Sequence, residues 1–456
     1  MNKKIFMKYF KKFSILYFKH RRVTNASCSA SSSSHRNEYK IRDMGKIIQI
    51  NSKKNFKLFV LGFQLLIIFL SFQNCSSNTK LKDPITTVNT PVDGVSDPTN
   101  SNTSPDNTNP TASCSVTDLE ATMTSTLNGV TNSSDFSFLV ERHDGRQFSY
   151  NRGVSHLTDY YESASTSKLV SAVIILRAVD KGYLTLENKP QDFIKNNTGA
   201  VTWPIASTKP LYNYITLRKL LSFTSGLLVP DLDSTNISNS IVCLSDGTAD
   251  FETCVKTIGF KNKDNTLSSS PQFYYSSSHL QVAGLMAIKA SGVSSWQDLF
   301  TQFKNETGLF NTSTYDLPSA TNPRLAGGMH WTALEYFAFL KAFKNGELLS
   351  SSLMNEMLSD QIANSELTYS PLIVALNEAW HYGFGSWQEC QNTTYNCVSG
   401  TRISSPGAYG SYPYWDRNKN YIGIVANQAT TTGNFHEGLD IERAVRSQVE
   451  SWTSCQ

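Results

Sequence analysis

Hydrophobic residues recur at regular spacings only after residue 114. The first such segment places an apolar residue at every third or fourth position, which predicts a helix. Its apolar positions are Val116, Leu119, Met123 and Leu127. Two apolar runs follow, at 136–140 and 147–150. Because Asp144-Gly145 between them favours a tight turn, we expect a β-hairpin there.

The most strongly apolar helix is expected directly after Ser165. Its apolar positions are Leu169, Val170, Val173, Ile175, Leu176 and Val179. Gly182 comes next, and glycine is a common residue at the end of a helix. Further helices are expected at 217–222, 280–290 and 333–343, so the middle of the chain is predicted to be mainly helical.

Strands are expected again near the end of the chain, at 409–415 and 421–427, with a polar turn between them. A last helix follows, with apolar positions Leu439, Ile441, Val445, Val449 and Trp452. This order predicts an α+β fold, in which an antiparallel sheet from both chain ends is flanked by N- and C-terminal helices and a mainly helical lobe is inserted. A binding site is expected between the sheet and the lobe.

Charge separates the beginning of the chain from the rest. Residues 1–75 hold 15 Lys and Arg against 2 Asp and Glu, whereas the remainder holds 26 against 35. The later part is therefore acidic, and the overall charge of +4 does not indicate nucleic-acid binding. We expect no nucleic-acid partner.

Residues 44–75 are predicted to be an export leader. Three lysines precede an apolar run at 58–72, which has the length of a signal peptide rather than of a membrane-spanning helix. Cys75 follows and is itself followed by two serines, as at a lipoprotein cleavage site, so we expect lipidation at Cys75. An uncleaved anchor and simple secretion are the alternatives. Residues 1–43 lie upstream of the leader, and Met44 is an alternative start.

Residues 76–113 contain no aromatic residue and are rich in Ser, Thr, Asn, Asp and Pro. Such a segment buries too little apolar surface to offset the entropy lost on ordering, which predicts a disordered tether. The folded domain is then expected at 114–456. The leader and the tether together predict an exported protein that is anchored to a membrane of the bacterial cell envelope, in the periplasm or at the outer membrane.

Six cysteines remain after Cys28 and Cys75 are set aside, and no C-x-x-C pair occurs among them. An even number in an exported protein favours disulfides, with buried free thiols as the alternative. Short separations make the pairs Cys243–Cys254 and Cys390–Cys397 geometrically easy, although sequence does not determine connectivity.

No metal or cofactor is expected. The chain has no His-Glu-x-x-His pattern of the zinc-protease kind, no phosphate-binding loop and no Gly-rich nucleotide signature after a strand. His279, His330 and His436 stand singly, which favours packing or surface roles over metal binding.

Ser165 and Lys168 are the strongest candidates for chemistry. Side chains three residues apart on a helix lie on one face, one turn apart. A serine hydroxyl becomes a nucleophile when a neighbouring base takes its proton, and a desolvated lysine can be that base. Ser77 and Lys80 have the same spacing, but they lie in the tether, where no apolar helix follows.

Five motifs occur in a characteristic order in the predicted domain. They are Ser165-Thr166-Ser167-Lys168, the segment 215–227, Phe273-Tyr274-Tyr275-Ser276-Ser277, Ala326-Gly327-Gly328-Met329 and Tyr382-Gly383-Phe384-Gly385. Together they resemble the class C β-lactamase-related serine hydrolases, a penicillin-binding-protein-like family. The resemblance covers roughly residues 114–456.

The resemblance implies that Ser165 is the acylated nucleophile and Lys168 its proton acceptor. It implies that Tyr275 is a phenolate-like base whose pKa nearby cations lower, with a core aromatic as the alternative. Gly407 would keep a strand edge open to substrate, and the backbone N–H groups of Ala408 and Ser165 would form an oxyanion hole.

Two positions depart from the family pattern. Ser277 stands where the family has Asn, and Ser405 stands where it has a cation. Both are still expected to contact substrate, although a plain Pro-Gly turn is the alternative reading for the segment at Ser405. The absence of a cation disfavours β-lactams as substrates more than it disfavours hydrolysis in general, unless Arg402 replaces the cation.

The resemblance also implies that Cys114 pairs with Cys455, because the terminal helices of such folds pack on the same sheet face.

The sequence therefore predicts a cell-envelope serine hydrolase that forms an acyl-enzyme with an ester or amide, as an esterase, a DD-peptidase-like enzyme or a β-lactamase-like enzyme. Its expected partners are a small-molecule or peptide acyl substrate and, through the N-terminal lipid or anchor, a membrane. A catalytically silent envelope binding protein with the same fold is the alternative. A purely structural surface lipoprotein would explain the leader but not the ordered motifs.

Overall fold

The computed structural model describes residues 114–204, 210–265, 268, 270–398, 400–429 and 434–455. The predicted leader at 44–75, the residues before it and the predicted tether at 76–113 lie outside the described residues, and Cys75 lies outside them too. Within the described ranges, no helix is both long and apolar enough to cross a membrane.

An antiparallel sheet of seven strands, counted over the described residues, is built from segments near both ends of the domain. Its strand order is β2-β1-β12-β11-β10-β9-β8. The strands are β1 (Phe136–Glu141), β2 (Gln147–Arg152), β8 (His381–Tyr382), β9 (Trp387–Gln388), β10 (Arg402–Ser404), β11 (Tyr412–Asp416) and β12 (Tyr421–Asn427). Because β1 pairs directly with β12, residues near the start and the end of the domain lie side by side in one sheet, as predicted.

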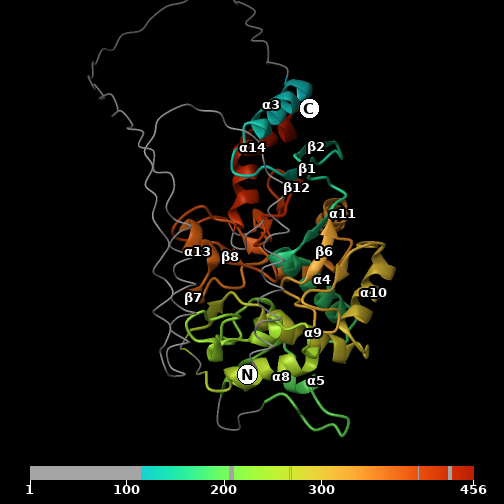
Figure 1. Cartoon of the computed structure of the whole chain (residues 1–456), viewed down its shortest axis with the longest axis vertical. Helices are drawn as coiled ribbons and strands as arrows, with labels where there is room; N and C mark the ends of the chain where they lie inside the picture. Colours follow the sequence, from blue (N-terminus) through green and yellow to red (C-terminus); the bar gives the residue numbers. More distant parts are fainter. Residues whose placement is uncertain are drawn as a thin grey trace, which may run out of the picture. The chain divides into compact units, whose positions relative to one another are not determined.

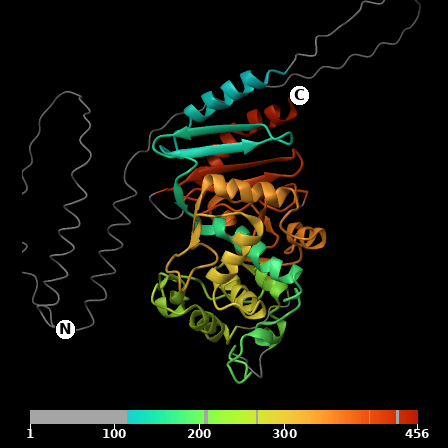
Figure 2. The same cartoon turned by 90° about the vertical axis from the view of Figure 1, so that its right-hand side faces the viewer.

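Helices cover both faces of this sheet. Figure 2 shows α3 (Val116–Asn128) and α14 (His436–Ser454) on one face and α11 (Ala333–Lys344) on the other. The five apolar positions predicted for the last helix are all fully buried: Leu439, Ile441, Val445, Val449 and Trp452. The predicted α+β arrangement, with terminal helices packed against the sheet, is therefore confirmed.

The segment between β2 and β8 forms the predicted helical lobe (Figure 1). Its α-helices are α4 (Ser167–Asp180), α5 (Pro190–Phe193), α6 (Pro210–Tyr214), α7 (Leu217–Leu221), α8 (Phe251–Asn262), α9 (Ser278–Ala290), α10 (Trp296–Thr307), α11, α12 (Ser351–Leu358) and α13 (Pro371–Leu376). Its 3-10 turns are η1 (Ala164–Thr166), η2 (Ile237–Asn239) and η3 (Val242–Ser245).

In the described part of the lobe, two small sheets accompany the helices. The strands β3 (Tyr160–Glu162), β6 (Met329–Thr332) and β5 (Thr314–Tyr315) form an antiparallel sheet in that order. The strands β4 (Gln272–Tyr274) and β7 (Glu366–Tyr369) pair in parallel. In the first sheet, β3 ends shortly before η1, and in the second sheet, β4 ends at Tyr274, next to Tyr275. The two sheets therefore position residues on either side of the candidate site.

Two local predictions differ from the structure. The strand expected at 409–415 begins only at Tyr412, because the residues before it form a turn in which the Gly407 N–H donates to the Ser411 carbonyl at 2.8 Å. Ser165 lies in η1, one short turn before α4, rather than in the α-helix itself. The predicted turn at Gly145 and the helix end at Gly182 are confirmed, since both glycines have positive φ.

Among the described residues, three disulfides close loops of very different length. Cys114 pairs with Cys455 and joins the start of α3 to the end of α14. Cys243 pairs with Cys254, and Cys390 pairs with Cys397. These are the expected pairings, and the alternative of free thiols does not hold for these six residues.

Candidate active site

A strained turn carries the candidate nucleophile. Ala164 has φ of +41°, which is unfavourable for a residue with a Cβ and typical of positions that a surrounding structure holds in place. The turn is held by Thr166, whose hydroxyl accepts from the Trp331 indole N–H at 2.9 Å and whose carbonyl accepts from the Tyr336 hydroxyl at 2.8 Å. The strain therefore sits directly before Ser165.

Lys168 lies on the first turn of α4 and reaches back to Ser165. Its Nζ donates to Ser165 Oγ at 2.8 Å and to the Ala326 carbonyl at 2.9 Å. The predicted pairing of the serine and the lysine on one face is therefore present. Ala326 belongs to a motif named from the sequence, but its carbonyl role depends on the fold, because it lies far from Lys168 in the chain.

The environment of Lys168 favours its neutral form. The side chain is 3% exposed, and burial lowers the pKa of the ammonium to about 7. The charge of Arg324 lowers this pKa further, whereas the carboxylate of Asp231 raises it. A lysine with such a pKa is neutral in a large share of molecules near neutral pH and can accept a proton.

Tyr275 completes the group around the hydroxyl of Ser165. Lys168 Nζ lies 4.5 Å from the centre of the Tyr275 ring, and the ring stacks on Trp387 with centroids 4.9 Å apart. The Tyr275 backbone N–H donates to the Tyr369 carbonyl at 3.1 Å, which fixes the residue at the end of β4. The structure thus brings together the three predicted catalytic residues.

The expectation that cations lower the pKa of Tyr275 is wrong. Burial raises the pKa of the phenol well above its usual value, although hydrogen bonds with Ser165 and Trp387 oppose this rise. The cation that lies over the ring is Lys168, and its own pKa near 7 means that it carries full charge only at lower pH. The phenol of Tyr275 is therefore neutral where Lys168 is a base.

The segment at Ser405 lies against the turn of the candidate nucleophile. The Ser405 hydroxyl donates to the Ser165 carbonyl at 2.9 Å, and the Ser405 side chain is buried. A Cβ at Gly407 would lie 2.6 Å from the Ser163 carbonyl oxygen, so only glycine allows this close approach. Over the described residues, the backbone N–H groups of Ser165 and Ala408 donate to no backbone carbonyl.

Ser277 lies at the start of α9, where its backbone N–H is bound by an acidic side chain. Asp231 accepts from this N–H through both carboxylate oxygens, at 3.0 and 3.1 Å. Asp231 also acts electrostatically on Lys168 and Tyr275. Sequence reasoning missed Asp231, since it lies in a loop without a recognisable motif and only the fold brings it to the site.

Arg402 does not supply the missing cation. Its side chain is 6% exposed, and it forms ion pairs with Glu442 at 2.5 Å and with Asp416 at 3.4 Å. Burial alone would lower the pKa of this guanidinium, but Glu442 and other anionic neighbours raise it above its usual value. Arg402 is therefore held between the sheet and α14.

The three single histidines have local partners. His279 is buried, and its ring nitrogens lie 2.9 Å from Ser225 Oγ and from the Tyr274 carbonyl. His330 pairs with Asp316, and His436 pairs with Asp440. Within the part of the chain that the structure describes, no three His, Cys, Asp or Glu side chains gather as a metal site would require.

The fold and the serine–lysine pair define a class of protein, the serine hydrolases with a mixed helix and sheet domain. A family model named Beta-lactamase matches residues 142–446. The chain therefore belongs to the beta-lactamase family. No protein of curated function matches the sequence.

Solved structures of several serine hydrolases share the fold. A candidate beta-lactamase from Bacteroides dorei DSM 17855 is 21% identical, with a TM-score of 0.56 over 74% of this chain and 99% of its own. A penicillin-binding protein from Bacillus halodurans is 16% identical, with a TM-score of 0.52 over 72% and 98%. The hydrolase EstCE1, with promiscuous acyltransferase activity, is 15% identical, with a TM-score of 0.55 over 72% and 98%.

Proposed function

We propose that this protein cleaves esters or amides in the cell envelope through an acyl-enzyme on Ser165. The observation that carries the proposal is the distance of 2.8 Å between Lys168 Nζ and Ser165 Oγ. At that distance, the neutral amine of Lys168 takes the hydroxyl proton directly, which is the step that a serine nucleophile requires.

Acylation begins with this proton transfer. As Lys168 accepts the proton, Ser165 Oγ bonds to the substrate carbonyl carbon, and the carbonyl π electrons move to oxygen. The backbone N–H groups of Ser165 and Ala408 donate to that oxyanion. When the carbonyl re-forms, the bond to the leaving group breaks, and the leaving group takes the proton from Lys168 through the neutral phenol of Tyr275. The product is an ester between Ser165 and the acyl group.

Deacylation repeats the same steps with water. Lys168 is neutral again after acylation, so it accepts a proton from the attacking water, with Tyr275 as the relay. The water oxygen bonds to the acyl carbon, and Ser165 Oγ leaves and recovers its proton. Tyr275 acts in both halves as a phenol that accepts one proton while it donates another, which its raised pKa allows.

The surroundings of Ser165 favour a neutral substrate with an apolar acyl group. Asp231 places a negative charge near Lys168, and the hydroxyl of Ser405 is engaged by the Ser165 carbonyl. Two side chains with apolar surface are exposed at segments adjoining the site: Leu232, which follows Asp231 in the chain, at 66% exposure, and Tyr369, whose carbonyl accepts from the Tyr275 N–H, at 41%. A substrate carboxylate would meet repulsion here, whereas an uncharged acyl chain would gain apolar contacts.

We further propose that the domain is exported and held at the membrane by a lipid on Cys75. The apolar run at 58–72 and the polar segment at 76–113 support this proposal. Expression of the full chain and of Cys75→Ser in a bacterium, followed by membrane fractionation, tests it. Retention of Cys75→Ser in the membrane would indicate an uncleaved anchor instead of a lipid.

Labelling with a fluorophosphonate probe tests the hydrolase proposal. We expect covalent attachment at Ser165, found by peptide mapping, and no attachment to Ser165→Ala. The catalytically silent binding protein is the alternative function. A folded domain that does not react with the probe would support that alternative and contradict the proposal.

A further inference from the structure

The peptide group before Tyr275 is bound at both of its polar atoms. Its carbonyl belongs to Tyr274, and this oxygen lies 2.9 Å from Nε2 of His279 on α9. Its N–H belongs to Tyr275 and donates to the carbonyl of Tyr369 on β7 at 3.1 Å. Because a peptide group is planar, it cannot rotate without losing one of these hydrogen bonds. The direction in which the Tyr275 side chain leaves the backbone is therefore held by two separate elements.

His279 also supports the ring of Tyr275 through a second aromatic residue. The imidazole stacks on the ring of Phe223, with centroids 4.9 Å apart and planes at 13°. The Phe223 ring in turn contacts the Tyr275 ring, with centroids 5.6 Å apart. Phe223 has φ of +60°, which is rare for a residue with a Cβ, and its carbonyl accepts from the Tyr274 N–H at 3.0 Å. His279 is thus linked to Tyr275 by the backbone and by packing.

The partners of His279 define where its ring proton lies. A carbonyl can only accept, so Nε2 carries the proton that is donated to Tyr274. Nδ1 is then an acceptor, and the Ser225 hydroxyl donates to it at 2.9 Å. Both Ser225 and His279 are fully buried, so a substrate does not reach this pair and it does not form a second nucleophile and base. Burial also lowers the pKa of His279 to about 3, which keeps the ring neutral near neutral pH.

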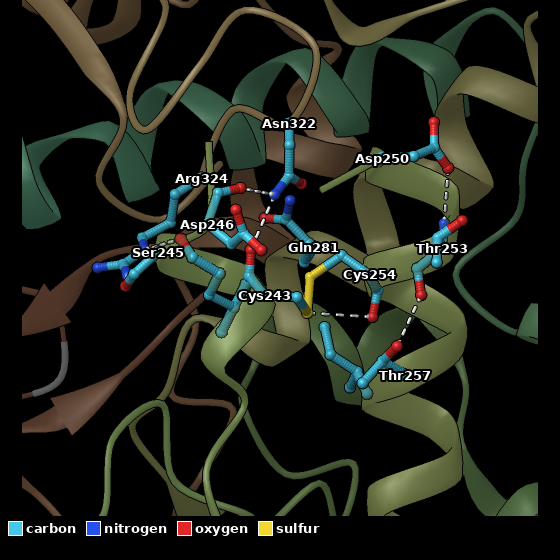
Figure 3. The surroundings of a disulfide bond; sticks show 12 residues. Cys243, Ser245, Asp246, Asp250, Thr253, Cys254, Thr257, Gln281, Asn322 and Arg324 are labelled. Carbon is cyan, nitrogen blue, oxygen red and sulfur yellow. Dashed lines mark hydrogen bonds between the residues drawn. A yellow bond between two sulfur atoms is a disulfide. The ribbon is translucent and has the colours of Figure 1, made fainter. Parts of the chain in front are cut away.

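The start of α9, which carries His279, is anchored in the lobe. Gln281, two residues further on, is fully buried; it donates to the Pro323 carbonyl at 2.9 Å and accepts from the Leu325 N–H at 3.1 Å. Figure 3 shows Gln281 in the surroundings of the disulfide that joins α8 to η3. These contacts give the His279 ring a defined place in the fold.

We propose that His279 is a positioning residue for the phenol of Tyr275. It holds the phenol through the Tyr274 carbonyl and through the ring of Phe223. The phenol relays a proton between Lys168 and the leaving group or water, and such a transfer depends strongly on the position of the relay. This inference deepens the proposed function and rests on it.

The position of the phenol matters only in the steps in which the phenol carries a proton. Lys168 takes the Ser165 proton directly, so attack on the substrate does not require the phenol. The phenol is required when a poor leaving group must be protonated, and in deacylation, when water gives up a proton. Fluoride and nitrophenolate leave without protonation, whereas an alkoxide does not. Loss of the His279 contact should therefore slow some steps and leave others unchanged.

The test compares two substitutions in the full chain that differ by one methylene group. In His279→Gln the amide nitrogen reaches the place of Nε2 and can donate to the Tyr274 carbonyl, whereas the shorter amide of His279→Asn does not reach it. We expect His279→Asn to lower kcat for nitrophenyl butyrate by about tenfold to a hundredfold, because deacylation slows. Its kcat/KM for this ester should change little, so KM falls with kcat. His279→Gln should restore most of kcat.

A second substrate with the same acyl group tests the leaving-group step. For ethyl butyrate, whose alkoxide must be protonated as it leaves, we expect His279→Asn to lower kcat/KM itself by about tenfold to a hundredfold. The rate of Ser165 labelling by a fluorophosphonate probe should stay within about threefold of wild type, because fluoride needs no proton. A merely structural role of His279 would lower all of these rates by a similar factor.

A double substitution tests whether His279 acts through Tyr275. In a chain that carries Tyr275→Phe, the relay is absent, so His279→Asn should cause no further loss of kcat. Circular dichroism shows whether each variant is folded. If His279→Asn does not fold, nitrogen-15 NMR of wild-type protein labelled at histidine carries the test, with His279→Gln identifying the signal. We expect a neutral ring with its proton on Nε2.

The outcomes separate the inference from the proposed function. A wild-type Ser165 that does not react with the probe would overturn the proposed function, and the inference with it. With a reactive Ser165, equal losses for the two esters and for labelling, or no rescue by His279→Gln, would overturn the inference alone. A further loss of kcat in the Tyr275→Phe background, or a ring proton on Nδ1, would also overturn it.

Discussion

Lys168 and Arg402 are both buried cationic side chains, but their surroundings differ. Lys168 contacts a hydroxyl, a carbonyl and an aromatic ring, and no acidic side chain lies within ion-pair distance of it among the described residues. Among the described residues, Arg402 lies within ion-pair distance of three carboxylates, those of Glu442, Asp416 and Glu389, and it lies over the ring of Tyr414. The pKa of Lys168 falls to about 7, whereas the pKa of Arg402 rises.

The difference shows that partners, rather than burial alone, decide the charge of a buried base. Burial lowers both pKa values, and in Arg402 the carboxylate of Glu442 outweighs this effect. A permanent ion pair holds β10 and α14 together but cannot exchange protons. A lysine without a direct carboxylate partner contributes less to holding the fold and can transfer a proton near neutral pH.

The largest effect expected from this comparison is on catalysis. Lys168→Met should lower kcat/KM for a nitrophenyl ester by about 10⁴-fold or more, because Ser165 then has no adjacent base. Its free energy of unfolding, measured in urea, should fall by no more than about 1 kcal/mol, since a buried amine is replaced by an apolar side chain of similar length. Ser165→Ala serves as the reference for complete loss of hydrolytic activity. Near-normal turnover by Lys168→Met would point to another base.

The corresponding substitution of Arg402 should lower the stability of the fold instead of the catalytic rate. Arg402→Met leaves Glu442 buried with fewer partners, and we expect the free energy of unfolding to fall by about 3 kcal/mol. The kcat/KM of the folded protein should stay within about threefold of wild type, because Arg402 touches none of the candidate catalytic residues. If Arg402→Met lost activity while it kept its stability, the assignment of Arg402 to the fold would be wrong.

A smaller effect is expected on the ratio of kcat/KM between two substrates. A nitrophenyl ester should be hydrolysed about ten to a hundred times more efficiently than nitrocefin, because one charge-assisted hydrogen bond to the β-lactam carboxylate, worth roughly 1.5 to 3 kcal/mol, is absent. Asp231→Asn removes the nearby negative charge and should reduce this ratio. Efficient nitrocefin turnover by the unmodified protein would show that another cation binds the carboxylate.

His279 extends the comparison to a buried base without a charged partner. Burial lowers its pKa to about 3, although its hydrogen bond to the Tyr274 carbonyl opposes this effect. Between that value and the usual 6.5, the unfolded chain binds one proton more than the folded one, so stability falls as pH decreases. The expected slope is about 1.4 kcal/mol per pH unit.

Urea unfolding between neutral and mildly acidic pH measures this slope. His279→Gln should reduce the pH dependence by one proton. An unchanged slope in His279→Gln would show that His279 takes up its proton in the folded state.

Local spacing in the sequence determined the parts of the fold that depend on neighbouring residues. The period of apolar positions predicts α3, α4 and α14, and the short separations favour two of the disulfides. The spacing of Ser165 and Lys168 places their side chains together, because three residues correspond to about one turn, whether the turn is 3-10, as at Ser165, or α-helical, as at Lys168. The order of five motifs then predicted the family.

Only the tertiary structure decided which distant groups surround that pair. Asp231 and Arg324 come from separate loops, and no spacing in the sequence relates them to Lys168. For the same reason, sequence reasoning assigned the wrong direction to the pKa of Tyr275 and could not decide whether Arg402 replaces the missing cation. Charge states and the accessibility of a side chain depend on burial and on the sum of long-range electrostatic interactions, which only the packed fold defines.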